Sequence, residues 1–256
     1  MGQPLAISQG STIAAEPDLS PDGRWLTSTR HNGKWENIFV SENNGNGLRQ
    51  LTDGVYVDRS PRWSPDGRRI AFYSNRSVTW QVWAIHPDGS GLEQLTHEPR
   101  GNVLCPVWSP DGSRLAYSIM DVNSFVINIG KALDAQSPQP LPIPSGLGLY
   151  FMVTDWSHDG GTLAGVVHEL AGPAGIGIYS LGQRSFERLT DRGDFPRWLS
   201  DGRRLLFECA GKLYLVNSRS KKVHEVPCVT PYEVLIAGEC RLDSGLDRSD
   251  RHSVGL

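Results

Sequence analysis

Five segments of the chain share one pattern of hydrophobic and polar positions. Each has a large apolar residue, a polar turn that contains Asp-Gly, and a run in which apolar and polar residues alternate. The clearest copy is PRWSPDGRRIAFYSNR, residues 61–76. Alternation with a period of two residues on both sides of a tight turn is typical of two antiparallel strands joined as a hairpin. The pattern therefore predicts a β-hairpin at each copy.

The copies recur at a nearly constant spacing. The aspartates of their Asp-Gly pairs are separated by 44, 45, 48 and 42 residues in turn. In SPDG, proline presets the backbone for a type I turn, aspartate suits the next position, and glycine adopts the left-handed conformation that closes the hairpin. We therefore assign these carboxylates to structural turns: Asp22, Asp66, Asp111, Asp159 and Asp201.

Two further strands are predicted in each repeat. A third apolar run follows every hairpin, at 37–41, 81–85, 125–129, 177–181 and 212–216. Three repeats continue with a polar turn and a fourth strand that ends in Leu-Thr, at 45–54, 89–98 and 183–192. Four short antiparallel strands in a period of about 45 residues are typical of a β-propeller blade. The predicted fold is an all-β propeller with five recognisable blades.

The large apolar residue before each turn is expected to lie in the core. This residue is Leu19, Trp63, Trp108, Trp156 or Trp198. Aromatic side chains bury large apolar areas, so we expect these residues to pack between neighbouring blades.

The two ends of the chain suggest how the ring closes. Residues 7–10, ISQG, lie 44 residues before 51–54, LTDG, so the chain is expected to begin with a fourth strand. Such a strand completes the last blade and removes two free sheet edges. Residues 232–242 resemble one more strand, but 244–256 have no SPDG, no alternation and no Leu-Thr. We expect a propeller over 1–243 with a partial or degenerate sixth blade, followed by a poorly ordered tail.

One segment departs from the repeat inside the ring. Residues 131–151 contain four prolines where the other repeats have a glycine turn. We expect either a longer loop or an edge strand with irregular hydrogen bonding.

Composition and charge narrow the possible partners. The 256 residues carry a net charge of −3 and have a pI of about 6.2, whereas nucleic-acid-binding domains usually have a basic stripe and a high pI. The chain has no run of eighteen apolar residues and does not begin like a signal peptide. We expect no nucleic-acid partner and no membrane insertion by this segment. The chain is expected to be soluble as given, or periplasmic or otherwise extracytoplasmic if it is part of a longer protein.

No metal or other cofactor is expected. The cysteines, Cys105, Cys209, Cys228 and Cys240, have no C-x-x-C spacing and no neighbouring histidine cluster. We expect Cys105 and Cys209 to be buried, reduced thiols. A Cys228–Cys240 or Cys209–Cys228 bridge is the alternative in an oxidising compartment.

Catalytic motifs are also missing from the sequence. There is no Gly-x-Ser-x-Gly for a serine hydrolase, and the glycine loop, His-Arg-Asp and Asp-Phe-Gly of a kinase are absent. We therefore expect that this segment is not an enzyme.

Charged residues stand beside the core residue in most repeats. The adjacent position holds Asp18, Arg62, Val107, Asp155 or Arg197. Strand alternation turns these side chains to the face opposite the core residue, and near the ring axis several can converge. One interpretation is that the charges pair across a solvated funnel. The other is a mixed-charge mouth that docks a peptide end or an acidic ligand, with Arg62 and Arg197 binding its carboxylate.

The repeats resemble those of TolB-type, WD-repeat-like propellers. The hallmark of these propellers is P-x-W-S-P-D-G-x-x-I-A-F followed by I-W-x-x-x-x-D-G-S-G-x-x-x-L-T. Copies two and three are close matches, and copies one and five are recognisable. Copy four is weakened by His158 and Gly161. The resemblance covers about residues 3–227.

The resemblance implies a fold more strongly than a function. Similar propellers occur in the periplasmic envelope protein of that name, as sensor-like parts of bacterial serine/threonine kinases and transcriptional regulators, and as substrate-gating domains of peptidases. Phrases such as FYSNRSVTWQVWAIHPDGSGLEQLT are most similar to the kinase-associated set. We expect a monomeric, non-catalytic scaffold for a protein or peptide partner, within a larger bacterial signalling or envelope protein. The alternative is an accessory propeller of a peptidase or polysaccharide lyase whose catalytic part is absent.

Overall fold

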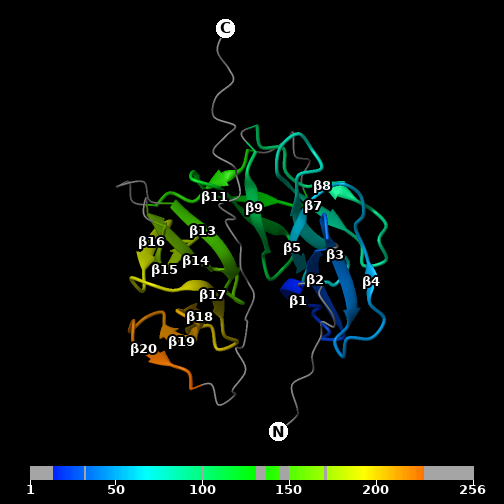
Figure 1. Ribbon diagram of the computed structural model, residues 1–256. Helices are drawn as coiled ribbons and strands as arrows, with labels where there is room; N and C mark the ends of the chain where they lie inside the picture. Colours follow the sequence, from blue (N-terminus) through cyan, green and yellow to red (C-terminus); the bar gives the residue numbers. More distant parts are fainter. Residues whose placement is uncertain are drawn as a thin grey trace.

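The computed structural model describes residues 14–31, 33–99, 101–130, 137–143, 150–169 and 172–227. Within these residues every regular element is a β-strand, and the strands form five four-stranded antiparallel sheets. The sheets are arranged as blades around a common centre (Figure 1). The prediction of an all-β propeller with five recognisable blades is therefore confirmed.

In each blade the four strands follow one another from the ring axis outwards. Blade one consists of β1 (Ala14–Leu19), β2 (Trp25–His31), β3 (Glu36–Glu42) and β4 (Arg49–Gln50). Blade two consists of β5 (Asp58–Trp63), β6 (Ile70–Ser74), β7 (Gln81–Ile85) and β8 (Glu93–Gln94). Blade three consists of β9 (Val103–Trp108), β10 (Arg114–Ile119), β11 (Asn123–Asn128) and β12 (Gln139–Pro140).

The last two described blades have the same order. Blade four consists of β13 (Tyr150–Trp156), β14 (Thr162–Glu169), β15 (Gly172–Ser180) and β16 (Ser185–Arg188). Blade five consists of β17 (Asp194–Trp198), β18 (Arg204–Cys209), β19 (Lys212–Asn217) and β20 (Val223–Glu225). The proline-rich segment contributes β12, a two-residue edge strand that pairs with β11. The expected edge strand is therefore present at Gln139–Pro140, and residues 131–136 and 144–149 of the segment lie outside the described residues.

The tryptophan before each turn joins its blade to the preceding one. All four tryptophans are buried, at Trp63, Trp108, Trp156 and Trp198. Trp63, for example, packs in one cluster with Ile38 and Val40 of blade one. Leu19 is 55% exposed, so the prediction that it lies in the core is wrong. No described residue belongs to a blade before blade one, and Leu19 therefore has no described sheet to pack against.

Ring closure depends on parts of the chain that the structure does not describe. The expected strand exchange by residues 7–10 lies outside the described residues. The same is true of the expected partial sixth blade at 232–242 and of the tail at 244–256. Among the described strands, blades one and five are the two ends of the series (Figure 1).

The turn aspartates close the hairpins. Oδ1 of Asp66 accepts hydrogen bonds from Ser64 Oγ at 2.6 Å and Arg68 N at 3.0 Å, and Ser64 Oγ accepts one from Arg69 N at 2.9 Å. The same set recurs in three other repeats, at Asp22, Asp111 and Asp159. The predicted structural role of these four carboxylates is thus visible in their contacts.

In the fifth turn the aspartate accepts hydrogen bonds from a different set of donors. Leu199 replaces the serine, and Asp201 accepts hydrogen bonds from the backbone N–H groups of Arg203 and Arg204 and from Arg204 Nε at 2.6 Å. Hydrogen bonds to the ionised form lower the pKa of all five turn aspartates. Asp111, held mainly by Ser109 Oγ, and Asp201, held mainly by the Arg203 N–H, have pKa values of about 2.

The recurring Leu-Thr at the end of the fourth strand also has a structural explanation. The threonine hydroxyl accepts a hydrogen bond from the backbone N–H of a buried residue in the third strand of its own blade. The pairs are Thr52 with Ile38 N at 2.9 Å, Thr96 with Val82 N at 2.8 Å and Thr190 with Ile176 N at 2.9 Å. The hydroxyl therefore satisfies a backbone donor at the point where the fourth strand has already ended.

We predict that Asp111→Asn removes part of the acid sensitivity of the fold. The pKa of Asp111 is about 2 in the folded protein and 3.8 ordinarily. Its ionised form therefore stabilises the fold above about pH 4, and this contribution is lost as the pH falls towards 2. Urea unfolding followed by tryptophan fluorescence should show a smaller loss of stability between pH 4 and pH 2 for the variant than for the wild type.

The control for this measurement is Asp53→Asn, which changes an exposed aspartate outside the hairpin turns. It should reproduce the wild-type pH dependence. Parallel pH profiles for Asp111→Asn and the wild type would contradict the structural role of the turn carboxylates.

Candidate functional site

All five inner strands have an irregularity at the same place. The register with the second strand shifts just before Asp18, Arg62, Val107, Asp155 and Arg197. In four blades the residue two positions earlier has a left-handed backbone, namely Glu16, Ser60, Cys105 and Phe195, with φ between 50° and 54°. A β-bulge of this kind bends the strand and redirects the side chains that follow it. The bulges therefore set the direction of the five predicted funnel residues.

Four of these residues form two equivalent pairs between neighbouring blades. Arg62 Nη1 lies 3.7 Å from Asp18 Oδ1 between blades one and two. Arg197 Nη1 lies 3.7 Å from Asp155 Oδ1 between blades four and five. In both pairs the aspartate belongs to one blade and the arginine to the next. The structure thus brings the predicted charges together as cross-blade ion pairs.

Each aspartate also holds the backbone of the following blade. Asp18 Oδ2 accepts a hydrogen bond from Trp63 N at 2.8 Å, and Asp155 Oδ2 accepts one from Trp198 N at 2.6 Å. On the second pair, Arg197 Nη1 donates to Thr154 O at 3.0 Å. One carboxylate therefore binds both the tryptophan N–H and the arginine beside it.

The four charges influence one another across the ring axis. Burial raises the pKa of Asp18, and Asp155 adds to this, whereas Arg62, the Trp63 N–H and Arg197 oppose it. Burial, followed by the positive charge of Arg197, lowers the pKa of Arg62 to about 10. Arg62 therefore remains a cation at neutral pH, and the two pairs belong to one electrostatic unit.

The fifth predicted residue does not join this unit. Val107 is buried and packs with Trp156 of blade four. It occupies the equivalent position in blade three, between the two ion pairs in the order of the ring. The funnel therefore has two charged parts separated by an apolar one.

The two arginines differ in their exposure and in the hydrogen bonds that their guanidinium groups donate. The Arg62 side chain is 14% exposed and the Arg197 side chain 35% exposed. Within the described part of the chain, the Arg62 guanidinium donates no hydrogen bond and has only the 3.7 Å contact with Asp18. Its N–H groups are therefore available to an acceptor in the funnel.

Glu16 is a funnel residue that the sequence did not reveal. Although buried, its carboxylate accepts hydrogen bonds from Thr29 Oγ1 at 2.8 Å, Ser60 N at 2.7 Å and Ser60 Oγ at 2.8 Å. It thereby joins the bulges of blades one and two. The other repeats have no acidic residue at this place, so the repeat pattern carried no signal for it.

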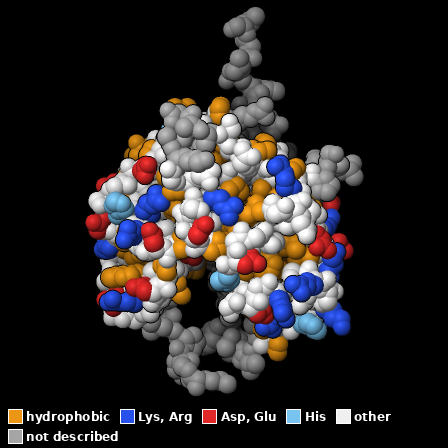
Figure 2. Space-filling model, turned by 180° about the vertical axis from the view of Figure 1, so that it is seen from behind, with side chains coloured by type: hydrophobic (Ala, Val, Ile, Leu, Met, Phe, Trp, Pro, Cys, Tyr) orange, Lys and Arg blue, Asp and Glu red, His pale blue; other side chains and the backbone are white. Residues whose placement is uncertain are grey.

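The two described cysteines differ in how they match the expectation of buried, reduced thiols. Cys105 is buried but forms a disulfide, so the expectation of a reduced thiol is wrong for this residue. Cys209 is free but only partly buried. The described residues contain no group of three or more His, Cys, Asp or Glu side chains that could hold a metal ion. Within the same residues no helix is long and apolar enough to cross a membrane. On the face shown in Figure 2, basic and acidic side chains are interspersed.

We predict that Asp155→Ala destabilises the protein by about 1–3 kcal/mol, because it removes the acceptor of the Trp198 N–H and the counter-charge of Arg197. Asp155→Asn keeps an oxygen acceptor and should cost less. Urea unfolding followed by tryptophan fluorescence measures both variants. Equal stability of the alanine variant and the wild type would show that the cross-blade contact is unimportant.

Comparison with known proteins identifies related sequences and folds. A family model described as the TolB beta propeller domain matches residues 2–142. Among curated proteins no sequence matches the chain. Among solved structures, a TolB-type protein from Agrobacterium tumefaciens has a TM-score of 0.68 at 18% identity, over 86% of this chain and 82% of that one.

Two enzymes also contain similar propellers. A puromycin-hydrolyzing peptidase from Mycobacterium tuberculosis has a TM-score of 0.63 at 17% identity, over 85% of this chain but only 39% of the peptidase. An oligogalacturonate lyase in complex with manganese has a TM-score of 0.58 at 14% identity, over 84% of this chain and 68% of the lyase. At such identities these likenesses show a shared fold.

Proposed function

Because the chain belongs to the TolB beta propeller domain family, we propose that it is a non-catalytic binding scaffold. Its funnel recognises a carboxylate of a protein or peptide partner. In this proposal the propeller is the sensor or docking part of a larger bacterial signalling or envelope protein. The membership supports a propeller, and the chemistry of the funnel supports the choice of ligand.

The observation that carries this proposal is the state of Arg62. Its guanidinium is mostly enclosed, yet it donates no hydrogen bond to any described residue and lies 3.7 Å from its counter-ion. A planar guanidinium presents paired N–H groups that match the two oxygens of a carboxylate. Arg197, with a side chain 35% exposed, offers a second cation to the same ligand.

The aspartates give the funnel its selectivity. Asp18 and Asp155 hold the two arginines in place and make the four-residue set neutral overall. A neutral set does not attract anions over a long distance, so the ligand must reach the arginine N–H groups directly. This favours a single carboxylate on a chain that enters the funnel, such as a peptide end or an acidic side chain.

The scaffold needs no conformational change to bind. All four residues stand on inner strands beside bulges, and their aspartates are tied to the backbone of the next blade. Sites built on strands that are fixed by such contacts are preorganised for binding. A bound partner would be coupled to a neighbouring domain through the chain termini.

We predict that a peptide with a free C-terminal carboxylate and no acidic side chain binds the chain, and that Arg62→Gln weakens binding by about tenfold to a hundredfold. Arg197→Gln should have a smaller effect, because Arg197 already donates to Thr154 O. Isothermal titration calorimetry with the free and the C-terminally amidated peptide measures both effects. Arg219→Gln, an exposed arginine in the turn before β20, is the matched control.

Two results would contradict the funnel as the site. One is equal affinity for the free and the amidated peptide, if the peptide has no acidic side chain. The other is loss of binding in Arg219→Gln to the same extent as in Arg62→Gln.

The alternative function is an accessory propeller of an enzyme. The fold shared with a peptidase and a lyase supports it, and the chain spans only 39% of that peptidase. We predict that the chain shows no turnover of peptides or of pectic oligomers, with or without Mn²⁺. Chromogenic peptide and unsaturated-product assays test this. Turnover that is lost on changing Asp18 or Asp155 to asparagine would overturn the non-catalytic proposal.

A further inference from the structure

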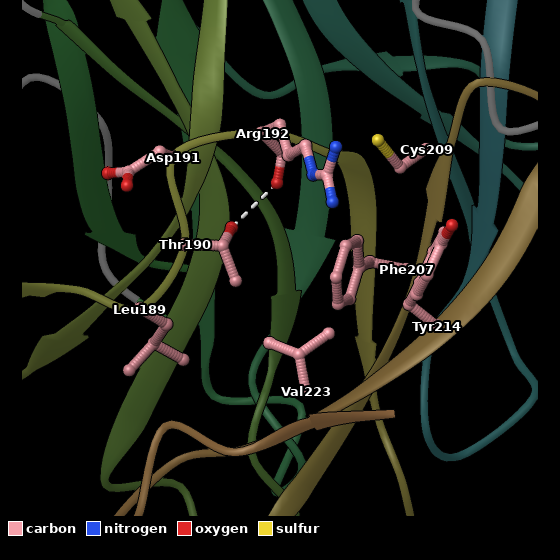
Figure 3. Close-up of a pocket in the computed structure, with 8 residues that line it drawn as sticks. All are labelled: Leu189, Thr190, Asp191, Arg192, Phe207, Cys209, Tyr214 and Val223. Carbon is pink, nitrogen blue, oxygen red and sulfur yellow. Dashed lines mark hydrogen bonds between the residues drawn. The ribbon is translucent and has the colours of Figure 1, made fainter. Parts of the chain in front are cut away.

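A second cavity lies away from the funnel, between blades four and five (Figure 3). Its volume is about 300 Å³, at the lower end of the range for small-molecule pockets. The loop between β16 and β17 forms one wall, with Leu189 and Arg192. The sheet of blade five forms the other, with Phe207, Cys209, Tyr214 and Val223. None of the four charged funnel residues lines it.

The equivalent space in blade two is filled by the protein itself. Phe72 and Phe207 each follow their turn aspartate by six residues, and their third-strand partners are Trp83 and Tyr214. In blade two the Arg76 guanidinium lies over these rings, 5.3 Å from the centre of Phe72 and 5.4 Å from that of Trp83. The Arg76 side chain is only 9% exposed. Its Nη2 lies 2.6 Å from Asp58 Oδ2.

Blade five has glycine at both positions that close the space in blade two. Gly211 follows the turn aspartate by ten residues, as Arg76 does, and Gly193 precedes the tryptophan by five residues, as Asp58 does. Gly193 has φ +110°, and a Cβ atom there would lie 2.4 Å from Phe207 Cδ2. The backbone therefore lies directly against the ring and leaves no room for a side chain. Gly211 has no side chain that could lie over Phe207 and Tyr214 as Arg76 lies over their equivalents in blade two, so these rings stay uncovered.

The interface between blades two and three is also closed, by a different pair. There Tyr117, the equivalent of Phe207, donates a hydrogen bond from its hydroxyl to Glu98 and stacks on Phe125 at 5.7 Å. Phe207 has no hydroxyl and cannot form this closure. Two sibling interfaces are thus sealed by polar groups of the chain, and the one between blades four and five is not.

The walls of the cavity favour a flat, apolar group. The Phe207 and Tyr214 rings are stacked, with centres 5.6 Å apart and planes at 25°. Leu189 and Val223 add aliphatic surface. In blade two the group that lies over the corresponding rings is the planar guanidinium of Arg76. A planar ring of a ligand can lie over Phe207 and Tyr214 in blade five in the same way.

One cation at the rim of the cavity is directed at the rings. Asp191 also lines the cavity, but its side chain points away from the rings in Figure 3, and it shares Arg188 with Glu169, at 3.5 Å and 2.9 Å. Glu225 is paired with Lys212 at 2.9 Å. Arg192 extends its guanidinium towards Phe207 in the same view, and it forms no ion pair with any described residue. Arg192 is therefore the charged group that is placed to pair with a ligand lying on the rings.

We propose that this cavity binds a small aromatic carboxylic acid. Its ring lies on Phe207 and Tyr214, and its carboxylate pairs with Arg192. In blade two, Arg76 lies on the rings and Asp58 is its counter-ion. In blade five, the ring of the ligand would lie on the rings, and its carboxylate would be the counter-ion of Arg192. This site is independent of the funnel and of its proposed function.

The free thiol of Cys209 provides a direct readout of occupancy. It lines the cavity and is partly buried, so a bound acid should slow its alkylation. The full chain is treated with iodoacetamide in the presence of phenylacetate, of neutral phenylacetamide or of cationic benzylamine, and modification of Cys209 is followed by peptide mass spectrometry. We expect phenylacetate to protect the thiol at concentrations at least about tenfold lower than phenylacetamide, and benzylamine not to protect it.

Variants separate the cavity from the rest of the protein. Arg192→Gln should weaken phenylacetate about tenfold to a hundredfold and abolish its advantage over phenylacetamide. Val223→Trp, a change at an exposed position on β20, should fill the cavity and abolish protection. Arg219→Gln should bind phenylacetate as the wild type does, whether or not the funnel binds peptides. Thermal melts of each variant confirm that it is folded.

Three outcomes would overturn the proposal. The first is better protection by benzylamine than by phenylacetate, which would show that the cavity prefers a cationic ligand. The second is unchanged phenylacetate affinity in folded Arg192→Gln. The third is no protection of Cys209 by phenylacetate at tens of millimolar.

Discussion

The propeller depends on the packing of one tryptophan from each of blades two to five against the sheet before it. A four-stranded sheet cannot bury both of its faces alone, so each blade needs its neighbour to complete a core. Trp63 joins blade two to Ile38 and Val40 of blade one in this way. The carboxylate of Asp18 binds the backbone N–H of the same tryptophan. Apolar packing and a polar contact therefore act on one residue, and together they fix the distance between adjacent inner strands.

The fold was predictable because its determinants are local and repeated. The Asp-Gly turns and the Leu-Thr ends depend on hydrogen bonds within one blade, so Asp-Gly recurs in all five copies and Leu-Thr in three of them. Contacts between blades are less visible in the sequence. The position of Asp18 and Arg62 could be found from alternation, but their pairing depends on the register of two separate sheets. Leu19 matched the repeat and is nevertheless exposed, because burial at that position requires a preceding blade.

Both candidate sites arise where equivalent interfaces differ. In the funnel, Val107 interrupts a series of charged residues, so two ion pairs form instead of a continuous ring of charge. Between blades four and five, two glycines replace an ion pair that seals blade two. The repeat supplies a rigid frame with nearly identical interfaces. Both proposed sites lie at positions where one copy of the repeat differs from the others.

The close contact between Gly193 and Phe207 restricts how this chain can change over time. Sealing the cavity in the manner of blade two requires an aspartate at 193 and an arginine at 211. An aspartate at 193 would first collide with Phe207, and an arginine at 211 would have to adopt φ +76° while its guanidinium still lacked a counter-ion. Each single step is unfavourable before the other is made. The open interface is thus separated from the closed one by a mutational barrier, and a lineage that acquired it would tend to keep it.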